Sequence, residues 1–122
     1  GREIINPRPT QMASLFRLLQ PHTIGFITYS EGCNDDVNKI VWSALGWNPE
    51  ADVTGILHEY SRYFIGPHDE DSFAQGLLGL ERNWVGPIAK NADIGATFQH
   101  FQNLERNAPP QELLNSRFQE GL

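Results

Sequence analysis

One segment, Ile24-Gly25-Phe26-Ile27-Thr28-Tyr29, has the composition of a β-strand. Five of its six residues are β-branched or aromatic, which are the types that strands favour. Both alternating faces are apolar, so we expect a strand that is buried on both sides, as in a parallel sheet. The sequence offers no mate of comparable quality, since Glu3-Ile4-Ile5 is short. Unpaired buried backbone groups are costly, so this strand predicts a sheet that lies outside the sequence.

Around this segment, apolar residues recur at intervals of three and four, the spacing of one helix face. Six helices are expected. They run from Thr10 to Gln20, over about residues 35–46, from Asp52 to Gly66-Pro67, from Asp69–Asp71 to Gly86-Pro87, from Asp93 past Leu104, and from near Pro110 to Leu122. Thr10 and Asp52 are the expected N-caps of the first and third helices. The sequence therefore predicts a mainly α-helical chain with one buried strand.

The composition predicts a single small domain and excludes some partners. The chain has 122 residues, of which 15 are acidic and 9 are basic, and a formal net charge of −6. A surface for nucleic acid or anionic lipid needs a positive patch, and no apolar run approaches the roughly 20 residues that span a bilayer. We expect neither nucleic acid nor a membrane as a partner. The single cysteine, Cys33, has no mate for an intrachain disulfide.

Both ends of the sequence read as cut. Gly1 stands where an initiator methionine would, and Leu122 falls inside an expected helix. We therefore expect a piece of a longer chain, and the expected strand then pairs with the remainder of that chain. A trimmed or processed product explains the missing methionine equally well. In that case the strand pairs with a second subunit.

The turn after the expected strand holds the strongest candidates for chemistry, because ligands lie at the carboxyl ends of strands in parallel α/β folds. Glu31 is the candidate catalytic residue, as a general acid, a general base or a hydroxyl-binding carboxylate. Tyr29, Asn34 and Asp35 are candidate substrate contacts, the last two as hydrogen-bond partners of a polar substrate. An alternative stays open: Asn34 and Asp35 cap the next helix and complement its dipole.

Tryptophan and histidine supply the remaining candidates. Trp47, in the turn Gly46-Trp47-Asn48-Pro49, is a candidate substrate contact because tryptophan faces stack on sugar rings, and a core or interface role is the alternative. The run His68-Asp69-Glu70-Asp71 has the residue types of a metal site. Consecutive positions cannot all converge on one ion, however, and helix capping explains them more simply. No nucleotide-binding or serine-hydrolase motif occurs, so we expect no metal and no cofactor.

Two further segments carry a family resemblance. The first is Trp42-Ser43-Ala44-Leu45-Gly46-Trp47-Asn48-Pro49-Glu50-Ala51-Asp52, and the second is Ile56-Leu57-His58-Glu59-Tyr60-Ser61-Arg62-Tyr63-Phe64-Ile65-Gly66. Together with the run from Asn6-Pro7 to Ser14 and with Gly25-Phe26-Ile27, they resemble the last strand–helix unit and following helices of certain glycoside hydrolases. These are the α-glucuronidases and the bacterial hexosaminidases that act on O-linked N-acetylglucosamine. The resemblance covers roughly residues 4–66.

The resemblance implies the last β/α unit of an eight-stranded α/β barrel over residues 1–48 and a helical extension over residues 49–122. It also implies the C-terminal part of a carbohydrate-active enzyme with a carbohydrate ligand and a periplasmic or extracellular location. These families place their catalytic carboxylates mainly on earlier strands, so we expect the chain to be inactive by itself. The alternative function is a small stand-alone helical module for protein–protein interaction.

Overall fold

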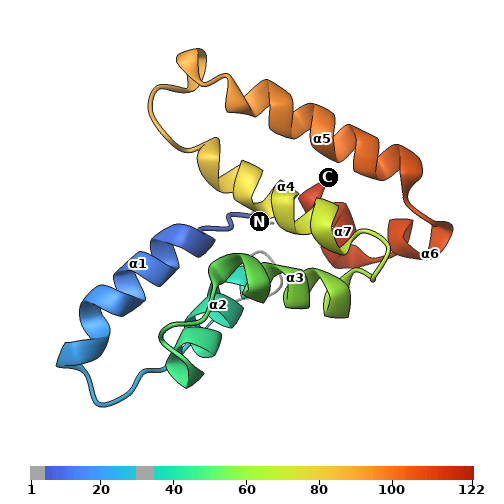
Figure 1. Cartoon of the computed structure of the whole chain (residues 1–122). Helices are drawn as coiled ribbons and strands as arrows, with labels where there is room; N and C mark the ends of the chain where they lie inside the picture. The colour runs from blue at the N-terminus through green and yellow to red at the C-terminus, as the bar shows by residue number, and fades with distance from the viewer. Residues whose placement is uncertain (1–4, 30–34) are drawn as a thin grey trace.

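The computed structural model describes residues 5–29 and 35–122 and shows a helical fold, with no strand in those residues (Figure 1). The expectation of a mainly α-helical chain is confirmed. The described helices are α1 (Pro9–Leu19), α2 (Asp36–Trp47), α3 (Val53–Phe64), α4 (Glu70–Arg82), α5 (Asp93–Asn107), α6 (Pro110–Leu113) and α7 (Ser116–Gly121), with 3₁₀ turns η1 (Gln20–His22) and η2 (Ile88–Lys90).

Helices that are neighbours in the chain pack on one another: α1 on α2, α2 on α3, α3 on α4 and α4 on α5. Figure 1 shows α1 and α2 at one end of the molecule and α5 at the other. The core takes side chains from α1 to α5 and from α7, and Val41, Leu57, Leu77 and Phe118 are wholly buried in it. Phe118 stacks on Phe73 of α4, so the C-terminal turns close the core.

The main difference from the sequence-based expectation concerns the predicted strand. Residues 24–29, named the apolar segment from here on, form no regular secondary structure. Ile24 and Ile27 have exposed fractions of 113% and 96%, whereas Phe26 is 45% exposed and its ring packs against Phe16 of α1 and Trp42 of α2. The prediction of a buried strand is wrong for the described residues. They contain no neighbouring strand, and a strand without a mate leaves its backbone groups unpaired. The described residues therefore show no barrel unit.

The starts of the helices were predicted in part. Asp52 caps α3 as expected, since its side chain accepts a hydrogen bond from the Gly55 amide at 2.8 Å. Thr10 does not cap α1, which begins one residue earlier. Glu81 of α4 serves that end instead, because its carboxylate accepts from the amides of Thr10 and Gln11 at 3.1 and 2.9 Å and from the Thr10 hydroxyl. A carboxylate there also complements the helix dipole.

The expected last helix is two short helices. Asn115 separates them, because its side-chain oxygen accepts from the amides of Arg117 and Phe118 and so caps α7. Its side-chain nitrogen donates to the Phe64 carbonyl at 2.5 Å. One asparagine thus starts α7 and joins it to α3.

A buried polar network fixes the C-terminal turns to the body. The Asp36 carboxylate, at the start of α2, accepts from the Tyr60 hydroxyl at 2.7 Å and from Arg117 Nε at 2.8 Å. The Arg117 guanidinium also lies over the Phe64 ring, 4.3 Å from its centroid. Burial and the bond to Asp36 raise the pKa of Tyr60 above its ordinary value, so the phenol stays a hydrogen-bond donor. The network joins α2, α3 and α7.

Candidate functional site

Two of the predicted site residues lie at one hollow. Tyr29 and Asp35 line a space of about 270 Å³, together with Trp42, Asn38 and Lys39 of α2. The hollow therefore combines aromatic faces with a carboxylate, an amide and an ammonium group. Small-molecule sites have this make-up, with apolar walls and a few polar groups that fix orientation. Asp35 occupies the N-cap position of α2, but its side chain makes no capping hydrogen bond.

The other predicted site residues are not brought to this hollow. Trp47 lies at the end of α2, is 94% exposed and does not line the space. Glu31 and Asn34 fall outside the described residues. A catalytic role for Glu31 and substrate contacts for Tyr29, Asn34, Asp35 and Trp47 stay predictions.

An aromatic cluster holds the apolar segment against the helices. The rings of Phe16, Trp42 and Phe26 meet edge to face, with centroid distances of 5.2 to 6.3 Å, which is a favourable arrangement for aromatic pairs. A second hollow, of about 240 Å³, lies at this cluster and is also lined by Leu19 and Ile24. Trp42 borders both hollows, so its ring belongs to the aromatic cluster and to the wall of each hollow.

The outer side of the apolar segment is unusual for a surface. Ile24 and Ile27 are almost fully exposed, and Tyr29 is 78% exposed. Scattered apolar side chains on a surface are ordinary, but neighbouring large ones mark places where other molecules bind.

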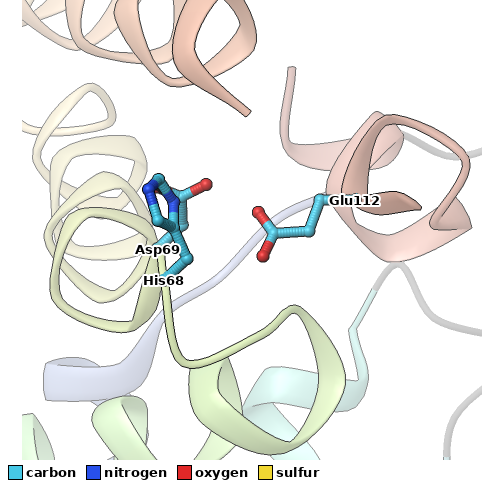
Figure 2. Close-up of side chains that lie close together, drawn as sticks. All are labelled: His68, Asp69 and Glu112. Atoms are coloured by element: carbon cyan, nitrogen blue, oxygen red, sulfur yellow. Dashed lines mark ion pairs between the residues drawn. The ribbon is translucent and has the colours of Figure 1, made fainter. Parts of the chain in front are cut away.

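A second cluster combines three metal-ligand side chains (Figure 2). His68 and Asp69 stand before α4 and Glu112 lies in α6, and one ligand atom of each lies within 4.8 Å of the other two. Asp69 and Glu112 are buried, at 5% and 4% exposed. Burial and the neighbouring Asp69 raise the pKa of Glu112 to about 7. Among the described residues this is the one such group of three.

Sequence reasoning found two members of this cluster and missed the third. It noted His68 and Asp69 as ligand types and excluded convergence along consecutive positions. Convergence needs Glu112, which belongs to another helix. No local spacing motif links it to the pair, so only the fold reveals the cluster.

Comparisons of the chain with protein-family models, with curated proteins and with solved structures found no match. Among the described helices, none is both long enough and apolar enough to cross a bilayer.

Proposed function

We propose that the chain is a helical interaction module that binds another polypeptide through its apolar segment. The observation that carries the proposal is the exposure of Ile24, Ile27 and Tyr29 on one short segment. Burying a large apolar side chain contributes roughly 1.5–3 kcal/mol relative to leaving it in water. Docking of this segment would recover that free energy for each of the exposed side chains.

The backbone of the apolar segment suits strand addition. Within the part of the chain that the structure describes, residues 24–28 take part in no backbone hydrogen bond. Their β-branched and aromatic side chains favour extended backbone. A partner with an open sheet edge would supply the missing hydrogen bonds, as in other complexes formed by strand addition. The partner is the remainder of a longer chain or a second subunit, and the segment becomes a strand only on binding.

Photo-crosslinking tests this proposal for either source of partner. A photoreactive amino acid replaces Ile27 in one variant and Phe98, an exposed residue of α5, in a control variant. We expect crosslinks from position 27 and none from position 98, with Ile24→Asp abolishing those from position 27. Mass spectrometry of the product identifies the partner as the same chain or another. Absence of any crosslink at position 27 contradicts the proposal.

A second candidate is the C-terminal part of a glycoside hydrolase-like enzyme, and the hollow beside Trp42 favours it. Tyr29 and Trp42 offer aromatic faces there, and Asp35, Asn38 and Lys39 offer hydrogen bonds. Sugar rings use both kinds of contact. In this proposal the apolar segment becomes the last strand of an α/β barrel only when the rest of a longer chain is present, residues 49–122 are the helical extension of that barrel, and the chain alone has no glycosidase activity.

Carbohydrate binding tests the second candidate. Amide NMR signals of residues 35–42 are followed during titration with oligosaccharides, in the natural chain and in Tyr29→Ala. We expect saturable shifts at Asn38 and Lys39 with an affinity that Tyr29→Ala weakens about fivefold or more, since an aromatic stacking contact contributes on the order of 1 kcal/mol. Glycosidase activity of the isolated chain, or no shift with any sugar, contradicts this candidate.

A further inference from the structure

We propose that His68, Asp69 and Glu112 form a binding site for a divalent transition-metal cation of the zinc class. The site does not depend on the proposed docking function, because it uses different residues and different chemistry. The three side chains converge, both carboxylates are buried, and the donor atoms are of the types that such a cation binds.

The fold brings the three side chains together from two distant parts of the sequence. Glu112 projects from α6 with its carboxylate turned toward Asp69 and His68, as Figure 2 shows. Gly66 permits this approach, because a Cβ atom there would collide with Glu112 Oε1. Asp69 Oδ1 lies 3.1 Å from His68 Nδ1. Three donors therefore face one point from the loop before α4 and from α6.

Because the two carboxylates are buried, it is energetically unfavourable for them to lie side by side without a cation. Asp69 Oδ2 and Glu112 Oε2 are buried and have no hydrogen-bond partner among the described residues. No lysine or arginine of the described chain forms an ion pair with either group. A buried polar atom without a partner is rare because it has lost its water, and two adjacent carboxylates repel. A cation of charge +2 would offset that repulsion and bind both oxygens.

The donor set selects the class of cation. One imidazole nitrogen and two carboxylate oxygens suit Zn²⁺, which takes three protein ligands and one water in open sites. Ligand distances of about 2.1 Å place tetrahedral donors about 3.4 Å apart, so ligand atoms that now lie within 4.8 Å of one another move closer by up to about 1.4 Å on binding. Ca²⁺ is disfavoured because it needs six to eight oxygen ligands.

The site has an access route. A hollow of about 310 Å³ between α4 and α5 is lined by His68 and Asp69, together with Ser72 and His100. A hydrated ion can reach His68 and Asp69 from this side. Water in the hollow can also complete the coordination of the bound ion.

Calorimetric titration of the tag-free chain with ZnCl2 near neutral pH tests the proposal, with thermal unfolding as a second readout. We expect saturable binding of one ion and a rise in Tm of about 5 °C or more when the ion is in large excess over its dissociation constant. CaCl2 should give neither. Glu112→Gln and Asp69→Asn should each weaken Zn²⁺ binding at least about tenfold.

His68→Gln keeps the test valid if a carboxylate variant fails to fold, because the His68 side chain is 62% exposed and its replacement leaves the core intact. It should also weaken binding at least about tenfold. The matched control is His58→Gln. His58 lies near two carboxylates, but Glu70 is 3.4 Å from Nδ1 and Asp71 is 3.4 Å from Nε2, so they face opposite ring nitrogens and cannot share one ion with it.

Unchanged Zn²⁺ affinity in His58→Gln, with loss in the three cluster variants, supports the site. The proposal is overturned if the natural chain binds no Zn²⁺, if Glu112→Gln or His68→Gln binds it as tightly as the natural chain, or if His58→Gln abolishes binding. The crosslinking result at Ile27 is independent of all these outcomes.

Discussion

The Phe26 ring lies against the backbone of Gly46, where a Cβ atom would collide with ring atoms Cε1 and Cζ. We expect Gly46→Ala to expel the ring from its position beside Trp42. The helix propensity of alanine exceeds that of glycine by up to about 1 kcal/mol, which offsets the lost ring contact. Thermal unfolding should therefore change little, while the fluorescence of Trp42 changes clearly.

Gly95 of α5 provides the matched control for that substitution, since a Cβ atom there meets nothing within 4 Å. Gly95→Ala should stabilise α5 slightly and leave the tryptophan fluorescence as it is. An unchanged Trp42 signal in Gly46→Ala would show that the apolar segment is not anchored as described.

The Tyr60 hydroxyl donates to the carboxylate of Asp36, which is 4% exposed. Tyr60→Phe removes this bond and leaves Asp36 with Arg117 alone. Hydrogen bonds to charged groups contribute about 1.5–3 kcal/mol, so we expect a loss of about 2 kcal/mol in the free energy of unfolding, measured by urea denaturation. Tyr63→Phe, on an 83% exposed side chain, should stay within about 0.5 kcal/mol. Equal effects of the two substitutions would contradict the network.

The pair of helices α3 and α4 is joined by Arg62, whose Nε donates to Glu70 Oε2 at 2.6 Å and whose second nitrogen donates to Oε1 at 3.1 Å. These bonds hold the pKa of Glu70 below its ordinary 4.5. An acid whose pKa is lower in the folded than in the unfolded chain stabilises the fold above the unfolded pKa. That contribution is lost as the pH falls through the lowered value.

We therefore expect an NMR titration of the Glu70 carboxyl carbon to give a midpoint below 4.5 in the natural chain and a higher midpoint in Arg62→Gln. The stability difference between the two proteins should disappear as the solution is acidified below that midpoint. Arg106→Gln, in the last turn of α5, is the control and should leave the Glu70 midpoint where it is. A midpoint that ignores Arg62→Gln would show that the ion pair does not form in solution.

The local sequence pattern was sufficient to predict the long helices. It was insufficient to predict the apolar segment and the contacts between distant helices. The apolar spacing and the Asp52 cap predicted the start of α3 because both signals lie within a few residues of the helix. The end of α1 that Glu81 binds carries no such signal, since the partner belongs to α4. The prediction of a strand over the apolar segment was wrong for a related reason. Strand propensity describes how a residue fits beside a neighbouring strand, and the described chain provides no such strand.

The candidate sites likewise combine residues that the local sequence predicts with residues that only the fold brings together. Tyr29 and Asp35 lie close together in the sequence and were both predicted as substrate contacts. In the structure they line one hollow. Glu112 escaped prediction because its meeting with Asp69 depends on the C-terminal turns folding back on the body. Besides the bonds of Asn115 and Arg117, one aromatic side chain holds those turns against the core.

Phe118 is wholly buried and stacks on Phe73, with ring centroids 5.8 Å apart. Phe118→Ala should cost about 3–5 kcal/mol, a large share of the roughly 5–15 kcal/mol that stabilises a small domain. Because α7 packs on the same core as the preceding helices, we expect one cooperative transition at lower denaturant, followed by circular dichroism. Phe98→Ala, on the exposed face of α5, should stay within about 0.5 kcal/mol. A separate early transition in Phe118→Ala would mean that the C-terminal turns unfold alone, and Glu112 would then leave Asp69 before the core opens.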